Sequence, residues 1–281
     1  MFLFNEEEYV SEAIESILSQ TYDNFWLIIL DDCSTDNTVN IVQQFASKDK
    51  RITFLRNNEK KGYLINYQIT FSNADDNAEY FAWAAGHDIH QPQWLEKMVK
   101  TLDKNRDTVM AYSKSKRIDE QGDEIKIKCP MFDTSGMHVT DRIKSICFTG
   151  TGFGNMIYGL FRTEAVRKVR GIRRCLVPDV LILMKLSLHG AFRQVDETLW
   201  YRRFAPKGSQ VNTIERQKRV AFGTIPYYGD LPWALTHLIS IFWDTVISPK
   251  AGSFSNRFYG IVLMYAFTRS RWRQMLPGAS L

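Results

Sequence analysis

A segment that contains both acidic and histidine residues, "GHDIHQP" (residues 86–92), directly follows the apolar run 80–85. Asp88 is a hard oxygen ligand that suits Mg²⁺ or Mn²⁺, whereas His87 is a nitrogen ligand that suits Mn²⁺ better. A divalent ion held by one or two protein groups neutralises a nucleotide diphosphate, whose oxygens and water complete the coordination shell. The segment therefore predicts a metal site at His87 and Asp88, and a simple helix cap ahead of Pro92 is the alternative.

A second acidic segment, "DDCSTDNT" (residues 31–38), follows the apolar run 25–30. The carboxylates of Asp31 and Asp32 can accept hydrogen bonds from a base N–H or from ribose hydroxyls. Capping of the next helix requires only one polar side chain, for which Asp36 is well placed. Two further acids in front of it indicate ligand binding, although the whole cluster could instead belong to the cap.

Two groups in the second half of the chain could complete such a site. Asp179 begins the apolar stretch "PDVLILMKLSLHG" (residues 178–190), and the N–H groups of a helix N-terminus would stabilise its carboxylate as an anion. This keeps it deprotonated, as a general base must be, but a plain N-cap is the alternative. Arg202 and Arg203, in "YRR", could hold a diphosphate or could form a solvated basic face.

Short apolar runs and helical patterns alternate in the first two-fifths of the chain, which indicates an α/β fold with a mostly parallel sheet. In such sheets ligands bind beyond the carboxyl ends of the strands, where both acidic segments lie. Little apolar sequence precedes the first helix, which predicts a short first strand or a sequence that begins within it. The predicted strands lie at 25–30, 52–55, 80–85 and 108–113, and the predicted helices at 10–18 and 94–102.

The second half of the chain is more varied. "DEQGDE" (119–124) predicts a hairpin or loop, 178–190 a buried helix and 192–204 a strand. Residues 205–220 are polar and basic and are expected to form a mobile loop. The aromatic-rich stretch 225–273 is expected to be helical.

Composition excludes several classes of protein. The 281 residues are 44% hydrophobic and 24% charged, as in a globular protein with a sizeable core. The net charge of +5 fits an anionic substrate or membrane surface and is too small to indicate nucleic-acid binding. Four separated cysteines indicate reduced thiols and a cytoplasmic setting. No signal-peptide pattern is visible, and the apolar stretch 231–247 is slightly short for a transmembrane helix and carries charge.

Known nucleotide and hydrolase motifs are absent from the sequence. No G-x-G-x-x-G follows the first strand and no P-loop is present, which disfavours NAD-dependent and P-loop chemistry. The lack of a G-x-S-x-G elbow disfavours an α/β-hydrolase.

The motifs resemble those of the family 2 glycosyltransferases. "FNEEEYVSEAIESILSQTYDNFWLIILDDCSTDNT" is similar to the start of that family, whose pattern runs Y-N-E-E, Q-T-Y and D-D-G-S-T-D. "YFAWAAGHDIHQPQWLEKMV" is similar to the segment that carries the family's Asp-x-Asp metal motif. The resemblance covers roughly residues 1–204, with "IYGLFRTEAVRKV", "PDVLILMKLSLHGAF" and "LWYRR" similar to the later landmarks of a related subgroup.

This resemblance implies a GT-A fold and transfer of a sugar from a nucleotide sugar to an acceptor hydroxyl, usually by one inverting displacement. It implies a nucleotide-sugar-binding half at 1–115, an acceptor-binding and catalytic half at 116–204, and a loop and helical tail at 205–281. By position, Phe4, Glu6, Asp31 and Asp32 would hold the nucleoside, Asp88 with His87 would hold the metal and the diphosphate, and Asp179 would deprotonate the acceptor.

The sequence departs from the family pattern at three positions. His87 replaces a family Asp, and Ala85 stands where the leading Asp often lies, which leaves weaker metal binding, a preference for Mn²⁺ or loss of activity open. Cys33 stands where the family favours Gly, so a positive φ there would strain the backbone. The Q-x-x-R-W motif is absent, which argues against a processive polymerase.

Two functions are therefore weighed. The first is a glycosyltransferase that uses a UDP-, GDP- or dTDP-linked sugar and a glycan or glycolipid acceptor, in surface polysaccharide or glycolipid synthesis. The second is a catalytically weak family member that binds a nucleotide sugar or a glycan. The aromatic and basic tail predicts contact with an anionic membrane at its cytoplasmic face, and a helix pair packed on the catalytic domain is the alternative.

Overall fold

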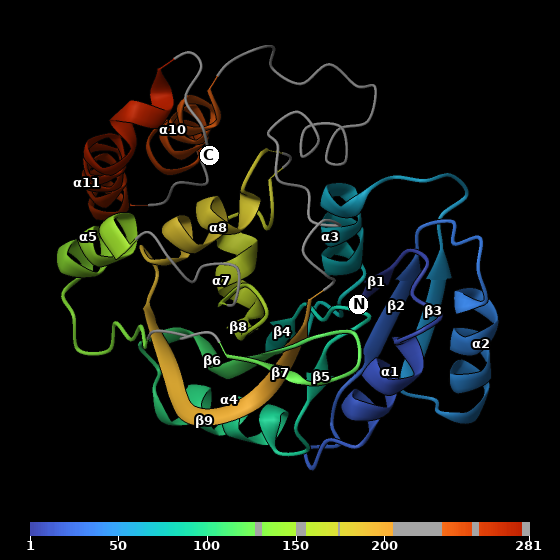
Figure 1. The fold of residues 1–281 in the computed structure, drawn as a ribbon. Coiled ribbons are helices and arrows are strands. Elements are labelled where there is room, and N and C mark those ends of the chain that lie inside the picture. The colour runs from blue at the N-terminus through green and yellow to red at the C-terminus, as the bar shows by residue number, and fades with distance from the viewer. Residues whose placement is uncertain (127–130, 150–155, 174, 205–231, 249–252, 277–281) are drawn as a thin grey trace.

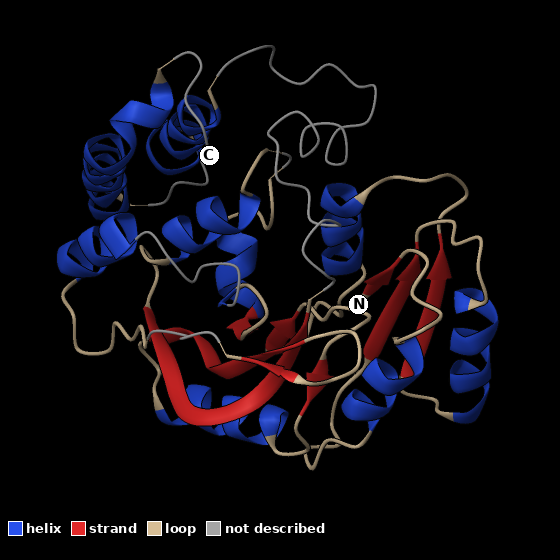
Figure 2. Cartoon of the chain, viewed as in Figure 1, coloured by secondary structure: helices blue, strands red, loops and turns tan. Residues whose placement is uncertain are grey.

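The computed structural model describes residues 1–126, 131–149, 156–173, 175–204, 232–248 and 253–276 (Figure 1). Two β-sheets form the centre of this part of the chain, and helices flank both sheets (Figure 2). A parallel bridge between Phe2 and Ala85 joins the edge of the first sheet to the segment that follows β4 (Tyr80–Ala82). The strand predicted at 80–85 is therefore interrupted, because the chain changes partner from the second sheet to the first.

The first sheet is fully parallel and has the order β1-β2-β3. Leu3 and Ile29 face α1 and α2 in one apolar cluster, whereas Phe2 points the other way and packs its ring 4.8 Å from that of Tyr67 on α3. The short first strand predicted from the sequence is present as two residues. The bounds are β1 (Phe2–Leu3), α1 (Val10–Leu18), β2 (Leu27–Asp31), α2 (Thr38–Lys48), β3 (Ile52–Arg56) and α3 (Tyr63–Ser72).

The second sheet is mixed, with the order β4-β8-β6-β9-β5 and β7 paired to β6. Only β6 and β9 run parallel in it, and the other pairs are antiparallel. The predicted parallel arrangement therefore holds for the first sheet and for this central pair. The bounds are β5 (Ile89–His90), β6 (Thr108–Ile118), β7 (Glu124–Ile125), β8 (Leu160–Arg162) and β9 (Ala191–Arg203). The turn between β6 and β7 confirms the predicted hairpin.

Helices cover both faces of the second sheet. Residues 110 and 111 of β6 point to opposite faces: Ala111 packs with α4 (Trp94–Lys104), and Met110 packs with α5 (Val139–Thr149) and α8 (Pro178–Leu186). The short helix α7 (Thr163–Lys168) follows β8. Helix α8 is apolar on all sides apart from Asp179 and Lys185, so it must be surrounded by protein, and it begins with a proline at its first position.

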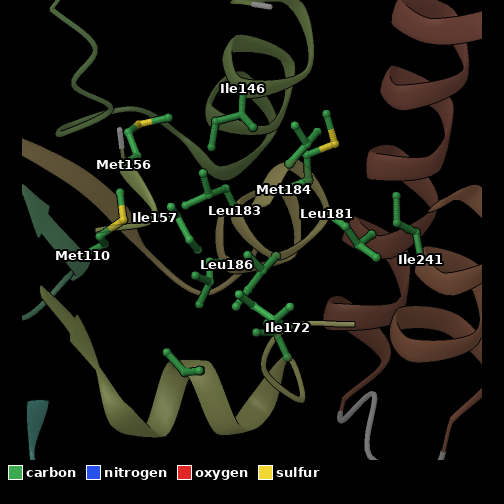
Figure 3. Packing of buried hydrophobic residues seen from close by; sticks show 14 of the residues in the cluster. Met110, Ile146, Met156, Ile157, Ile172, Leu181, Leu183, Met184, Leu186 and Ile241 are labelled. Atoms are coloured by element: carbon green, nitrogen blue, oxygen red, sulfur yellow. The ribbon is translucent and has the colours of Figure 1, made fainter. Parts of the chain in front are cut away.

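The C-terminal helices pack on the same core. Helix α10 (Trp233–Phe242) continues as a π-helical segment, Trp243–Ile247, and is followed by α11 (Phe254–Arg271) and a 3-10 turn, Trp272–Met275. Ile241 of α10 lies beside Leu181 of α8 (Figure 3). The predicted helical tail is thus confirmed for the residues described, with one face in the main core. The predicted mobile loop 205–220 lies outside the described residues.

Candidate active site

Two loops at the carboxyl ends of β1 and β2 interlock through hydrogen bonds. The backbone N–H of Asn5 donates to Ser34 Oγ at 2.9 Å, and that of Glu6 donates to Thr38 Oγ1 at 2.8 Å. In return, Asn5 Oδ1 accepts from the N–H of Thr35 at 2.8 Å. The segments around residues 4–7 and 31–38 therefore form one rigid wall at this edge of the sheet.

Asp31 and Asp32 are buried at the base of this wall. Asp31 accepts from the N–H of Ser34 and pairs with Arg56 Nε at 3.1 Å. Asp32 accepts from the N–H groups of Lys61 at 2.7 Å and Gly62 at 2.9 Å, and from Asn57 Nδ2 at 2.8 Å. Each carboxylate thus shapes a loop that borders the site.

Phe4 and Cys33 lie on the open side of the same wall. The ring of Phe4 is 38% exposed, and Lys60 Nζ lies 3.2 Å from its centroid, so an aromatic surface and a cation are presented together. Cys33 has φ of 64°, a left-handed conformation that an L-residue adopts only with strain. The backbone strain expected of a non-Gly residue at positive φ is therefore present at Cys33.

His87 is oriented by Glu6. Its Nδ1 lies 3.0 Å from Glu6 Oε1, and its Nε2 lies 3.9 Å from Asp88 Oδ1. Burial lowers the pKa of His87, but hydrogen bonding to Glu6 and the charges of Asp88 and Glu6 outweigh it, so the pKa lies above its ordinary value. In the neutral ring, a proton on Nδ1 leaves the Nε2 lone pair directed toward Asp88, as in carboxylate–histidine–metal arrangements.

Asp88 is held by the end of β9. It is 1% exposed, Trp200 Nε1 donates to its Oδ2 at 3.1 Å, and the backbone N–H of Arg203 donates to its Oδ1 at 3.0 Å. Burial raises its pKa, although these hydrogen bonds and the charges of His87 and Arg202 act against the increase. His90 is buried and stacks with Trp200, so it supports this residue and does not lie at the surface.

Arg202 and Arg203 point to opposite faces of β9, because successive side chains of a strand alternate. Arg202 stacks over Phe204 and Tyr158, and its charge favours the ionised forms of both Asp88 and Asp179. Arg203 is buried and its N–H groups donate to protein oxygens, which disfavours the diphosphate contact predicted for this residue. Arg203 donates to the carbonyls of His87 (3.2 Å), Asp119 (3.0 Å) and Glu120 (3.0 Å) and to the carboxylate of Glu12 (2.5 Å).

Asp179 lies in the first turn of α8, after Val177 and Pro178. Burial raises its pKa despite the favourable effects of backbone N–H groups and of Arg202. The backbone N–H groups at the helix N-terminus lower the pKa of Asp179, as the sequence predicts, but burial has the larger effect and the net shift is upward. A raised pKa makes Asp179 a stronger base than an ordinary aspartate.

Three tyrosines near Asp179 were missed by the sequence analysis. The charge of Asp179 contributes to raising the pKa of Tyr63, whose burial brings it to about 12. It also acts on Tyr67 and Tyr158, whose hydroxyls are hydrogen bonded at 2.9 Å. Tyr63 and Tyr67 lie one turn apart on α3, a spacing visible in the sequence, but only the fold brings them to α8.

The residues at 87 and 88 fit a two-ligand metal site. The Nε2 of His87 lies 3.9 Å from the Oδ1 of Asp88, and Glu6 contacts the other ring nitrogen of the histidine at 3.0 Å. Among the described residues there is no group of three or more histidine, cysteine or carboxylate side chains that could hold an ion. An ion here would need the oxygens of a bound diphosphate to complete its shell, which is common for Mg²⁺ and Mn²⁺ sites.

The two helix-flanked sheets have the GT-A fold. Residues 1–170 match the model of "Glycosyl transferase family 2", and the chain therefore belongs to this family. This membership confirms the resemblance seen in the sequence.

Curated relatives match over part of their length. A glycosyltransferase of Haemophilus influenzae is 36% identical over 102 residues, which are 36% of this chain and 31% of the relative. The putative glycosyltransferase EpsE of Bacillus subtilis is 39% identical over 107 residues, 38% of each chain. The matched region thus spans about a third of the length of these relatives.

Solved structures share the fold at low identity. TarS of S. aureus (residues 1–349), in complex with UDP-GlcNAc, has a TM-score of 0.65 at 15% identity, over 96% of this chain and 71% of that one. The mannosyltransferase PcManGT of Pyrobaculum calidifontis, in complex with GDP-Man and Mn²⁺, has a TM-score of 0.53 at 14% identity, over 100% of this chain and 74% of that one.

Proposed function

We propose that the chain moves a sugar from a nucleotide sugar to an acceptor hydroxyl by a single inverting displacement, in surface polysaccharide or glycolipid synthesis. The observation that carries this proposal is the position of Arg202, whose charge acts on both Asp88 and Asp179. Asp88, assigned to the donor side, and Asp179, assigned to the acceptor side, thus both lie within electrostatic range of one cation. An inverting displacement needs the acceptor-side acid and the donor-side acid at different places, because the base and the leaving group lie on opposite sides of the reacting carbon.

The donor would lie against the wall formed by residues 4–7 and 31–38. Phe4 and Lys60 offer an aromatic face and a cation to the base and its phosphates, while the buried Asp31 and Asp32 would bind the nucleoside from the base of the wall. Arg202 would pair with the diphosphate as its negative charge develops. His87 and Asp88 would hold a divalent cation, which neutralises the leaving diphosphate.

The acceptor would lie on the other side, between α3 and α8. Asp179 would accept the proton of the attacking hydroxyl, and its raised pKa increases the driving force for this transfer. The hydroxyl pair of Tyr67 and Tyr158 would orient neighbouring sugar hydroxyls. Burial of these groups excludes water, which would otherwise compete with the acceptor as nucleophile.

One observation favours the second candidate, a nucleotide-sugar-binding subunit without turnover. Both oxygens of Asp88 already accept hydrogen bonds from protein groups. Fewer of their lone pairs are therefore available to coordinate a metal ion. In this case the wall of residues 4–7 and 31–38 would still bind the nucleotide.

A thermal-shift screen with UDP-, GDP- and dTDP-sugars, each with and without Mn²⁺, tests binding first. The donor that shifts the melting temperature is then tested for transfer to glycan and glycolipid acceptors. We expect metal-dependent transfer that Asp179→Asn lowers by roughly 10²–10⁴-fold while the thermal shift remains. A donor that binds and is never turned over would support the binding subunit instead.

We also propose that the tail rests on an anionic membrane surface at the cytoplasmic face. Its outer side exposes apolar residues, among them Phe254, which is 86% exposed. Asp244 is the only acidic residue in 232–248 and 253–276, and it is buried, whereas Arg269 and Arg273 are exposed. Among the described residues, no helix is long and apolar enough to cross a membrane.

A further inference from the structure

The residue before Pro178 is held in an unfavourable backbone conformation. Val177 has φ of 49° and ψ of 50°, the left-handed region, which β-branched residues rarely adopt. A following proline also disfavours helical conformations of the residue in front of it. Something outside this short segment must therefore hold the chain in the form that presents Asp179.

The holding contact comes from the tail. His237 of α10 is fully buried, and its Nε2 donates to the carbonyl of Leu176 at 2.7 Å. Burial lowers the pKa of His237 to about 4, so the ring is neutral and carries its proton on Nε2 in this hydrogen bond. The ring packs against Trp233, 5.0 Å away between centroids, and against Phe267 of α11, 6.0 Å away. Its position is therefore fixed by both tail helices.

A second contact attaches the tail to α8 further along that helix. Lys185 of α8 is buried, and its Nζ donates to Asp244 at 3.0 Å and to the carbonyl of Val169 at 2.6 Å. Arg173 also pairs with Asp244, which lies in the π-helical segment. The tail thus holds α8 at Lys185 as well as ahead of its first turn.

We propose that His237 is a positioning residue for sugar transfer: its hydrogen bond to Leu176 fixes the strained segment 176–178 and so aims Asp179 at the acceptor hydroxyl. This inference rests on the proposed function of Asp179. The tail is then part of the catalytic apparatus, whether or not its outer side meets a membrane. The donor wall lies on other elements, so loss of the contact affects turnover and leaves donor binding unchanged.

Two variants with the same chemical group provide a matched test. In His237→Gln, the side-chain amide nitrogen reaches the position of Nε2 and can still donate to Leu176. In His237→Asn, the amide is one carbon shorter and cannot reach it. We expect His237→Asn to lower kcat by roughly tenfold to a hundredfold with an unchanged donor KM, because misplacement of a catalytic group acts on turnover. His237→Gln should retain most of the wild-type kcat.

Hydrogen exchange gives a readout that does not depend on activity. Amides within residues 175–181 should exchange faster in His237→Asn than in His237→Gln or wild type, while α1 and α2 keep wild-type protection. If His237→Asn does not fold, the double variant Val177→Gly/His237→Asn replaces it. Glycine adopts the left-handed form without strain, so this variant should fold, and its kcat should be lower than that of Val177→Gly alone.

The outcomes separate the two proposals. Wild-type kcat and wild-type exchange in His237→Asn overturn the positioning role, even if sugar transfer is established. Equal loss of kcat in the Gln and Asn variants also overturns it, because the hydrogen bond then does not matter. A wild type that transfers no sugar overturns the proposed function, and the exchange comparison still decides whether His237 holds the segment.

Discussion

The carboxylate of Asp88 accepts a hydrogen bond from the backbone N–H of Arg203 at 3.0 Å, between residues 115 positions apart in the chain. The side chain of Arg203 in turn donates to the carbonyl of His87. The two segments therefore fix each other, and the candidate metal ligands depend on the end of β9 for their position.

This contact predicts the effect of Asp88→Asn. Asparagine has one acceptor oxygen where Asp88 serves both Trp200 and Arg203, so one buried N–H loses its partner. We expect a loss of about 1–3 kcal/mol in the free energy of unfolding together with loss of metal-dependent transfer. Urea denaturation measures the first effect. Asp196→Asn, at an exposed carboxylate, is the control, and equal midpoints for both variants would contradict the expectation.

Asp179→Asn should have the opposite effect on stability. The folded-state pKa of Asp179 is raised, so the protein loses stability as pH rises from the unfolded value of about 3.9 through the folded value. Asparagine removes this cost. The variant should melt higher than wild type at pH 7 and equally at pH values below about 4, while transfer falls by roughly 10²–10⁴-fold. A variant less stable than wild type at pH 7 would show that the ionised carboxylate of Asp179 does not destabilise the folded protein.

Arg202→Gln should shift the pH dependence of turnover. The charge of Arg202 lowers the pKa of Asp179, so its removal raises that pKa further. The acid limb of kcat should move to higher pH, because Asp179 must be deprotonated to act as the base. Arg117→Gln is the control, since Arg117 also stacks on Phe204 but is not among the charges that act on Asp179. An acid limb that stays in place would remove Asp179 from the role of base.

Cys33→Gly should stabilise the protein relative to Cys33→Ala. Alanine keeps the positive φ of 64° and loses the contact of Sγ with the carbonyl of Asn57 at 3.2 Å. Glycine loses the same contact but removes the strain, which costs about 1–2 kcal/mol in an L-residue. Thermal unfolding of the two variants gives the comparison. Equal melting temperatures would mean that the loop relaxes when the side chain is small.

The membrane proposal predicts a loss of vesicle binding on substitution of the exposed tail. Phe254→Ser/Phe258→Ser should no longer co-sediment with vesicles rich in anionic lipid, because these rings supply the inserted apolar area. The control is Trp26→Ser, at a side chain that is 68% exposed and directly precedes β2; this variant should sediment as wild type does. Substitution is preferable to removal of the tail, since α10 and α11 share the main core. If the double variant sediments as wild type does, these tail residues do not bind the membrane.

Local patterns in the sequence determined much of the fold and of the site. Apolar runs predicted β2 and β3, and the family's preference for Gly at position 33 indicated where a positive φ would strain the backbone. Asp88, His87 and Asp179 were selected by ligand chemistry and by position at the ends of elements. These features depend on neighbours in the chain, so a local pattern carries them.

Tertiary structure decided which of these groups act together. The alternation of β9 separates Arg202 from Arg203, and burial raises the pKa of Asp179 against the effect of its helix end. Glu6 reaches His87 across 81 residues, and His237 reaches Leu176 across 61. Such contacts join distant segments through packing and desolvation, and these quantities depend on the whole fold. The sequence therefore determined the kinds of chemical group at this site. The tertiary structure determined their pKa shifts, the faces on which they lie and the residues that hold them in position.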